Sequence, residues 1–293
     1  MTPLRQRMIE DMQVRNLTPR TQESYLFQVS LFARHFRRSP ALLGPAEIRA
    51  YQLYLTNEKK LATSSILLAV ASLRFLYHVT LHKKWSLPEL LPLPRKPHKL
   101  PVVLSPEQVR RFLDGMEGAK HSAVLTTCYA AGLRLSEALR LKTSDIDSQR
   151  MVIRVEQGKG QKDRYVMLSP RLLEILRGYW RLQRPRHWLF PGEVPQRPLT
   201  TDAVQKACRK ARCRCGIAKP ITPHSFRHAF AVHLLESGAD VRTIQLLLGH
   251  RSLTTTAGYL RIATSKVCST TSPLDLLPRP VSAAPQPAAS ATL

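Results

Sequence analysis

The sequence predicts a mainly α-helical protein with one small β-sheet, built from an N-terminal helical bundle and a C-terminal α+β domain. The chain has 293 residues, which is enough for about two domains. Apolar residues recur at helical spacing through most of it, and one pair of alternating β-branched segments lies within residues 151–168. Five prolines fall within residues 87–101, so no helix or central strand can run through that span.

These observations predict four segments along the chain. A helical domain occupies residues 1–86, a stiff proline-rich linker residues 87–101, and a second domain residues 102–268. Residues 269–293 consist mainly of Ser, Thr, Pro and Ala, with too little apolar content to fold. We therefore expect a disordered tail after the second domain.

Four helices are expected in the N-terminal domain, because a capping residue or a proline at the first helical position marks the start of each. The start signals are at Thr2–Pro3, at Thr18–Pro19, at Pro45, and at Thr63 or Ser64.

The second domain opens with a capping box, Ser105 and Gln108, which starts a helix at Pro106. A second helical stretch over residues 121–141 is interrupted at Gly132. The alternating segments predict a β-hairpin, and the rest of the domain is expected to be helical. The hairpin strands are residues 151–156 and 164–168, and the later helices are residues 170–179, 201–213, 223–237, 240–248 and 253–260.

The charge balance indicates a polyanionic partner. Lys and Arg number 45 against 20 Asp and Glu, a formal net charge of +25. The excess is +10 in residues 1–99 and +15 in residues 100–268, which favours two basic domains closing on one nucleic acid. No apolar run approaches the roughly 20 residues of a membrane span, and no secretion signal is evident. The expected location is the cytoplasm, with no membrane partner.

Five scattered cysteines exclude a disulfide scaffold as the main source of stability. Cys208, Cys213 and Cys215 lie close together, but their spacing does not match a zinc knuckle and their neighbours are Arg and Lys. We therefore expect reduced thiols here, and neither a metal site nor a cofactor is predicted. No cluster of carboxylates suits a pair of Mg²⁺ ions either.

Two basic motifs precede the later helices. Arg134 follows the helix-breaking Gly132, and Glu137 lies one helical turn further on, where it can hold the guanidinium. The segment GKGQKDR, which contains Lys159, has glycines that allow a close approach to a phosphate, but it lacks the pattern of an ATP or GTP loop. Taken alone, each motif is also typical of an exposed helix pair or of a charged hairpin tip.

Two further motifs follow at helix ends. His224 and Arg227 occupy the first turn of a helix capped by Thr222, a position that favours anions. His250 comes directly after Gly249, which ends a helix, and Tyr259 follows nine residues later in a weakly apolar segment. A lone His or Tyr usually serves packing, but this tyrosine is not expected to belong to a core.

Together and in this order, the motifs resemble those of the tyrosine recombinases, the phage integrase family that includes the Xer recombinases. The resemblance covers about residues 1–265 and includes the stretch from Leu17 to Tyr25. It implies a SAM-like core-binding bundle followed by a tyrosine-recombinase catalytic domain. The implied activity is site-specific DNA recombination in a mobile element, with strands broken and rejoined through a 3′-phosphotyrosyl intermediate and without metal or ATP.

The resemblance also implies a role for each site residue. Arg134 and Arg227 would neutralise the phosphate, His250 would donate a hydrogen bond to it, and Tyr259 would be the nucleophile. His224 would act as base or phosphate positioner, and Lys159 as the acid that protonates the leaving 5′-oxygen. The residues expected to contact DNA are Arg20, Arg74, Lys162 and Arg164.

The expected partners are double-stranded recombination sites, bound by a homotetramer on two sites together with accessory DNA-binding proteins, in association with the nucleoid. Two alternative functions would also account for the positive net charge. A type IB topoisomerase-like enzyme that nicks and closes one strand has nearly the same residues. A non-catalytic DNA-binding relative would show a broken motif, whereas all six catalytic positions are filled here.

Overall fold

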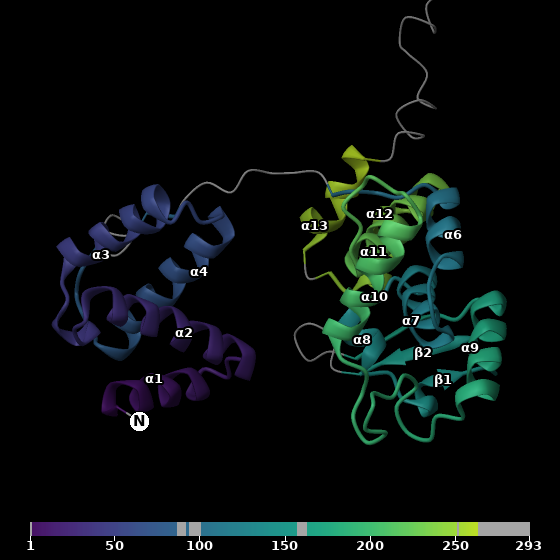
Figure 1. Cartoon of the computed structure of the whole chain (residues 1–293), viewed down its shortest axis with the longest axis horizontal. Helices are drawn as coiled ribbons and strands as arrows, with labels where there is room; N and C mark the ends of the chain where they lie inside the picture. The colour runs from purple at the N-terminus through teal and green to yellow at the C-terminus, as the bar shows by residue number, and fades with distance from the viewer. Residues whose placement is uncertain (1, 87–91, 94–100, 157–162, 251, 263–293) are drawn as a thin grey trace, which may run out of the picture. The chain divides into compact units, whose positions relative to one another are not determined.

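The computed structural model describes residues 2–86, 92–93, 101–156, 163–250 and 252–262, which form two compact units, Met1–Lys99 and Leu100–Leu293 (Figure 1). Each unit has a hydrophobic core of its own. The predicted tail, residues 269–293, lies outside the described residues, as does most of the predicted linker.

The N-terminal unit is entirely helical over its described residues, as predicted. Its elements are α1 (Pro3–Val14), α2 (Pro19–Phe36), η1 (Pro40–Leu42), α3 (Pro45–Leu53), η2 (Tyr54–Glu58), α4 (Thr63–Arg74) and η3 (Phe75–Thr80). The side chains of Thr2 and Thr18 cap α1 and α2, which confirms both start signals. The predicted cap of the fourth helix was wrong. Extended backbone at Ala62 starts α4 without a side-chain hydrogen bond, so Thr63 and Ser64 already lie in the first turn.

Aromatic rings fill the core of this unit. The ring of Phe32 lies 5.0 Å from that of Tyr51, and the buried hydroxyl of Tyr77 donates a hydrogen bond to the carbonyl of Pro40 at 2.9 Å. Among the described residues, one helical stretch, Thr63–Thr80, is long and apolar enough to cross a membrane by length and composition. Its apolar residues, including Val70 and Leu73, pack in this core, which accounts for its hydropathy.

The C-terminal unit combines the remaining described helices with one sheet. The elements are α6 (Pro106–Asp114), α7 (Ala119–Ala130), α8 (Leu135–Leu139), η4 (Thr143–Asp145), β1 (Ile146–Asp147), β2 (Val152–Val155), β3 (Arg164–Met167), α9 (Pro170–Gln183), α10 (Thr201–Arg214), α11 (Pro223–Glu236), α12 (Val241–Leu248), α13 (Leu253–Ala257) and η5 (Gly258–Arg261). The strands pair in the order β1-β2-β3, all antiparallel. The predicted hairpin is confirmed. The prediction missed β1, because two residues are too few to show an alternating pattern.

Helix α7 lies at the centre of this unit and contacts both α9 and α11 (Figure 1). The larger core joins α7, α9 and the inner face of the hairpin, where Ile153 pairs with Val166. A second apolar cluster lies around α11 and α12 and includes Phe230 and Leu248. Helices α11, α12 and α13 thus form a layer on α7. Element η5, near the end of the described residues, contacts α11 and α13 in this layer.

Gly132 permits the close approach of these layers. Its φ of +63° is a left-handed conformation that favours glycine, and a Cβ there would lie 2.4 Å from the ring of Phe230. The neighbouring cluster on α11 therefore depends on the absence of a side chain at this position.

Replacing Gly132 with Ala should destabilise the protein by about 2 kcal/mol or more, because left-handed strain adds to a clash with a packed ring. Gly178, inside α9, is the matched control, since a Cβ there meets nothing within 4 Å. Gly178→Ala should stabilise the protein by about 0.5–1 kcal/mol through helix propensity. Urea unfolding of the full chain measures both shifts, and equal effects of the two substitutions would contradict this account.

Candidate active site

The predicted site residues that the structure describes come together at the ends of four elements. Arg134 precedes α8, His224 and Arg227 lie in the first turns of α11, His250 follows α12, and Tyr259 lies in η5. Helix α11 contacts both α12 and η5, which brings these ends to one region. The predicted Lys159 and Lys162 fall in residues 157–162, outside the described residues.

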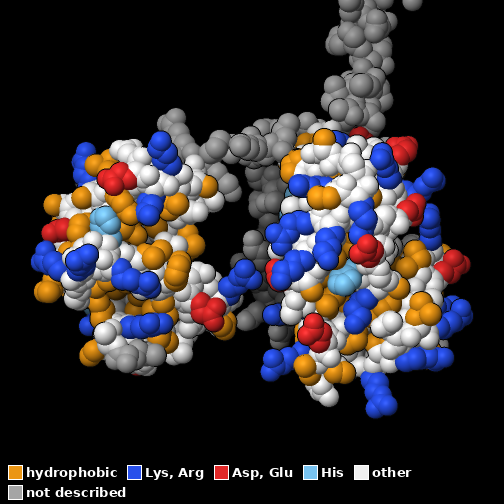
Figure 2. Space-filling model, viewed as in Figure 1, with side chains coloured by type: hydrophobic (Ala, Val, Ile, Leu, Met, Phe, Trp, Pro, Cys, Tyr) orange, Lys and Arg blue, Asp and Glu red, His pale blue; other side chains and the backbone are white. Residues whose placement is uncertain are grey.

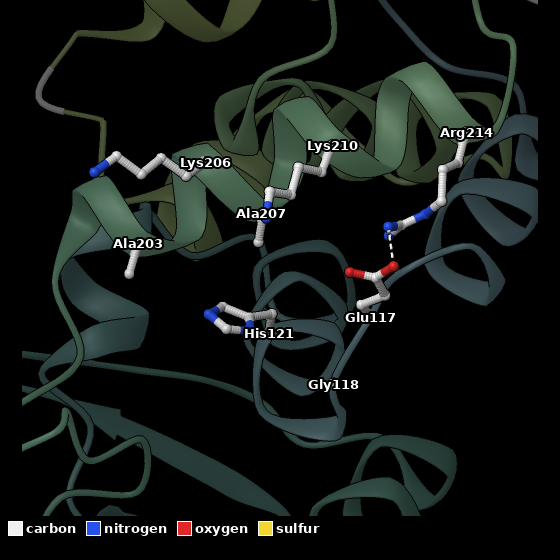
Figure 3. Close-up of a pocket in the computed structure, with 8 residues that line it drawn as sticks. All are labelled: Glu117, Gly118, His121, Ala203, Lys206, Ala207, Lys210 and Arg214. Atoms are coloured by element: carbon white, nitrogen blue, oxygen red, sulfur yellow. Dashed lines mark ion pairs between the residues drawn. The ribbon is translucent and has the colours of Figure 1, made fainter.

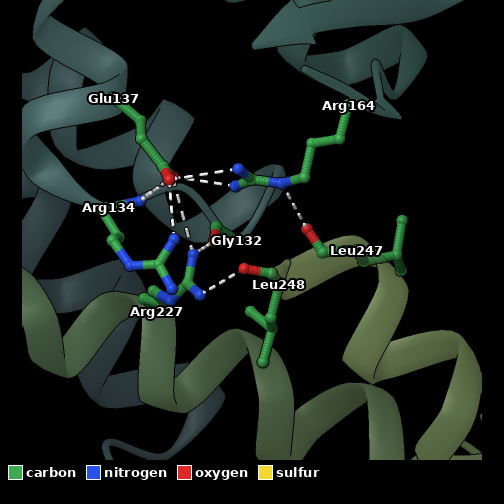
Figure 4. Close-up of polar contacts among 7 residues, drawn as sticks. All are labelled: Gly132, Arg134, Glu137, Arg164, Arg227, Leu247 and Leu248. Carbon is green, nitrogen blue, oxygen red and sulfur yellow. Dashed lines mark hydrogen bonds and ion pairs between the residues drawn. The ribbon is translucent and has the colours of Figure 1, made fainter. Parts of the chain in front are cut away.

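A single carboxylate holds three arginines at this place (Figure 4). Glu137 is 8% exposed. It accepts a hydrogen bond from Nη1 of Arg134 at 2.7 Å and two from the guanidinium of Arg164 at 2.8 and 3.1 Å. Nη1 of Arg227 lies 3.7 Å from the same carboxylate. The predicted Arg134–Glu137 pair is thus confirmed, and two further arginines share its carboxylate.

Arg227 is almost completely enclosed, with 1% of its surface exposed. Its Nη1 donates to the carbonyl of Gly132 and its Nη2 to the carbonyl of Leu248, both at 2.6 Å. Burial, followed by the charge of Arg134, lowers the pKa of Arg227 to about 10, against the opposing effect of Glu137. The side chain therefore stays charged at neutral pH in one fixed position.

Arg164, expected to contact DNA, directs its guanidinium into the protein. Besides its bonds to Glu137, its Nε donates to the carbonyl of Leu247 at 3.1 Å, and 13% of its side chain is exposed. Gly249, with a φ of +60°, allows this approach, because a Cβ there would lie 3.1 Å from the Arg164 side chain. Arg164 thereby ties strand β3, and the hairpin to which it belongs, to the end of α12.

The charge of Glu137 is secured by its partners. Burial alone would raise the pKa of this carboxyl, but the hydrogen bonds and charge of Arg164, with the backbone N–H and charge of Arg134, outweigh it and lower the pKa to about 2. Glu137 is therefore ionised throughout the physiological range, and the cluster of one carboxylate and three guanidiniums carries a net charge of +2.

The site histidines are kept neutral. Burial, reinforced by the charges of Arg227 and Arg134, lowers the pKa of His250 to about 4 and also lowers that of His224. Part of His224 is exposed at the surface, but its ring packs edge-on against that of His228 at 4.5 Å, which removes water from one side of it. His250 is half-buried, and its Nδ1 lies 2.8 Å from the hydroxyl oxygen of Thr256. Neutral imidazoles have both a donor and an acceptor nitrogen to offer a substrate.

Tyr259 is buried, with 5% of its surface exposed, in the apolar cluster of α11 and α12. The expectation that it would not belong to a core was therefore wrong. Its apolar neighbours come from helices distant in the sequence, which local composition does not reveal. Its hydroxyl lies 2.9 Å from Nδ1 of His228, a residue that the sequence analysis passed over. Burial raises the pKa of this phenol, while Arg227 and Arg134 oppose the rise.

The arrangement suits an anion that meets an oxygen nucleophile. Arg134 is 20% exposed in its side chain, so part of its guanidinium remains accessible next to the enclosed Arg227. The phenol of Tyr259 lies within the field of both charges. Phosphate oxygens bind such paired guanidiniums through charge-assisted hydrogen bonds. Among the described residues, no group of three or more His, Cys, Asp or Glu could hold a metal ion.

Each unit also carries basic side chains that are not members of this cluster. A cavity of about 390 Å³ between the start of α7 and α10 is lined by Lys206, Lys210 and Arg214 (Figure 3). Lys and Arg side chains also outnumber acidic ones on the visible face of the C-terminal unit (Figure 2). In the N-terminal unit, Arg20 is exposed near the start of α2 and Arg74 is half-buried at the end of α4.

The clustered cysteines do not come together as a set of ligands. Cys208 and Cys215 are buried and Cys213 is exposed, and none of the three forms a disulfide in the described part of the chain. Burial raises the pKa of Cys208 to about 11, so this thiol is protonated at neutral pH.

Glu137→Gln should lower the free energy of unfolding by about 3 kcal/mol at pH 7, because Arg227 and Arg164 lose a buried counter-charge. The pKa of Glu137 is depressed in the folded state, so its contribution is present above its ordinary value of 4.5 and is lost as the pH falls through about 2. The difference between wild type and variant should therefore shrink between pH 5 and pH 2. Urea unfolding across this range tests it, with the exposed Glu174→Gln as the control that should change little.

Comparison with known proteins shows the family of the chain. Residues 102–266 match the Phage integrase family, and residues 4–87 match the Phage integrase N-terminal SAM-like domain. The integrase/recombinase y4qK of Sinorhizobium fredii is 68% identical over 285 residues, covering 97% of this chain and 92% of its own. The tyrosine recombinase XerC of Halalkalibacterium halodurans is 32% identical over 279 residues, covering 86% and 90%.

The fold has known counterparts as well. A crystal structure of a lambda integrase dimer bound to a core site superposes with a TM-score of 0.72 at 18% identity, covering 86% of this chain and 95% of that one. That similarity shows a shared fold, and the sequence matches show the family. The chain is therefore a tyrosine recombinase of the phage integrase family.

Proposed function

We propose that this site-specific recombinase breaks and rejoins DNA through a 3′-phosphotyrosyl intermediate formed by Tyr259, without metal or ATP. The observation that carries the proposal is the position of the Tyr259 hydroxyl, which is hydrogen-bonded in a site whose charge comes from Arg134 and Arg227. The phosphotyrosyl bond conserves the free energy of the phosphodiester bond that it replaces. The free 5′-hydroxyl can therefore attack it and rejoin the strand.

The two arginines supply the stabilisation that the reaction needs. Attack of an oxygen on a phosphodiester adds negative charge to the non-bridging oxygens, and fixed guanidiniums are strongest where that charge develops. Arg227 is fixed by two carbonyls and Arg134 by Glu137, so neither has to reorganise during the reaction.

The remaining residues handle protons and position the phosphate. When Nδ1 of His250 accepts the hydrogen bond of Thr256, its Nε2–H is left to donate to a phosphate oxygen. His224, exposed and neutral, positions the phosphate at the start of α11, where free N–H groups favour an anion. Lys159 protonates the leaving 5′-oxygen.

The substrate in this proposal is a pair of double-stranded recombination sites bound by four subunits in the nucleoid of the cytoplasm. The excess charges of +10 and +15 in the two parts of the chain support binding of both units to one duplex. Arg20, Arg74 and Lys162 would contact the DNA backbone, whereas Arg164 is engaged with Glu137. Accessory DNA-binding proteins stay a prediction, to which no described residue points.

Tyr259→Phe should abolish covalent capture of DNA while leaving DNA binding and the fold intact, because the ring keeps its place in the apolar cluster. Denaturing electrophoresis with a labelled, nicked recombination site measures the adduct. Tyr129→Phe is the matched control. Its hydroxyl also lies 2.9 Å from a histidine Nδ1, that of His233, but outside this site, so the adduct should persist.

An adduct that survives in Tyr259→Phe would refute the assignment of the nucleophile. Absence of an adduct in the wild type, on every site that flanks its gene, would refute the catalytic proposal as a whole.

Lys159→Ala should slow cleavage by about 10²–10⁴-fold, because the 5′-oxygen then leaves without a proton donor. A substrate with sulfur at the 5′-bridging position should restore most of that loss, since a thiolate leaves without protonation. The single-turnover rate of adduct formation measures both effects, with the exposed Lys206→Ala as the control. Equal slowing on both substrates would assign Lys159 to phosphate binding instead.

A further inference from the structure

His228 is the described histidine that touches the proposed nucleophile. Its Nδ1 lies 2.9 Å from the hydroxyl oxygen of Tyr259, and the two ring centroids are 5.7 Å apart. His228 directly follows Arg227 on α11, so the helix that fixes the arginine also fixes this imidazole. The hydrogen bond therefore joins two elements that the fold holds in place, α11 and η5.

The surroundings of His228 keep its imidazole neutral. The ring of His224 lies edge-on at 4.5 Å, and the charge of Arg227 is close by on the same helix. The ring of His250, which follows α12, is nearly parallel to that of Tyr259, and the two ring centroids are 6.4 Å apart. Burial, followed by His224 and Arg227, lowers the pKa of His228 to about 4. A neutral imidazole carries its proton on one nitrogen only, and with that proton on Nε2 the lone pair of Nδ1 is directed at the phenol.

We propose that Nδ1 of His228 accepts the phenolic proton of Tyr259 as the phenol oxygen attacks the phosphorus. This inference rests on the proposed function and names its general base. The O–H bond of the phenol breaks and an N–H bond forms at Nδ1, while Nε2 carries the other proton of the resulting imidazolium. A phosphorus–oxygen bond forms to Tyr259, and the bond to the 5′-oxygen breaks with its proton supplied by Lys159. In the reverse step, His228 returns the proton to the departing phenolate.

Geometry favours His228 over His224 for this role. His224 is exposed at the start of α11, and the described hydrogen bond of the phenol goes to His228. A base must lie within about 2.6–3.2 Å of the proton-bearing atom, and Nδ1 of His228 lies 2.9 Å from the phenol oxygen. His224 therefore positions the phosphate, and His228 accepts the proton of the nucleophile.

The test is His228→Asn, because the asparagine amide occupies nearly the position of Nδ1 and keeps a hydrogen bond without accepting a proton. Adduct formation on a nicked site in a single turnover should be slower by about 10²–10⁴-fold at pH 7. The ratio of wild-type to variant rates should fall about tenfold for each pH unit above 7, as solvent base takes over. Other titrating groups of the site are common to both proteins, so they cancel in the ratio.

His233→Asn is the matched control, since His233 lies on the same helix and its Nδ1 is 2.9 Å from the hydroxyl of Tyr129. It should leave the rate and its pH dependence unchanged. A second variant, His228→Ala, tests whether the asparagine amide of His228→Asn has an effect of its own. Added imidazole should restore its adduct formation, with rescue following the neutral form of imidazole.

Each other outcome contradicts the proposal. A loss that is constant with pH would make His228 a positioning residue only, and an unchanged rate would give it no part in the reaction. A faster variant would mean that the hydrogen bond holds the tyrosine back. In all three cases a Tyr259-dependent adduct would leave the proposed function intact, whereas no adduct in the wild type would refute that function independently of His228.

Discussion

The carboxylate of Glu137 is the constraint on which the rest of the site depends. Three guanidiniums could not lie together in a partly buried place without a counter-charge, because their mutual repulsion adds to the loss of hydration. Glu137 balances one charge and leaves +2. A phosphodiester brings −1, and the transition state of attack on it approaches −2. The charge left uncompensated by Glu137 therefore matches the transition state better than the ground state, which is the condition for catalysis by preorganised charges.

Backbone carbonyls also fix the arginines of the site. The carbonyls that hold Arg227 belong to Gly132, before α8, and to Leu248, at the end of α12. A helix end has carbonyls without helical partners, so the arginine satisfies groups that would otherwise stay unpaired in the interior. The same end of α12 receives Arg164 from the hairpin. Four segments of the chain thus meet through arginine–carbonyl bonds, and a change in any one of them displaces the charges of the site.

Much of this could be predicted from the sequence, because its signals are local. Caps and prolines located the helices, alternation located the hairpin, and spacing alone paired Arg134 with Glu137. What the sequence did not reveal depends on tertiary contacts. The burial of Tyr259 and the inward direction of Arg164 arise from neighbours on other elements, and no local pattern carries that information. His228 was missed for the same reason, although its place directly after an arginine of the motif was a usable signal.

The arginines alone do not account for removal of the proton from the buried phenol of Tyr259. The charges of Arg227 and Arg134 oppose the rise that burial causes in the pKa of the phenol. A bound phosphate neutralises part of that field, so the phenol becomes harder to ionise at the moment when it must react. Water has little access to a hydroxyl on a side chain that is 5% exposed. The proton must therefore pass to an acceptor already in contact with the oxygen, and the hydrogen bond between Tyr259 in η5 and His228 in α11 supplies that contact.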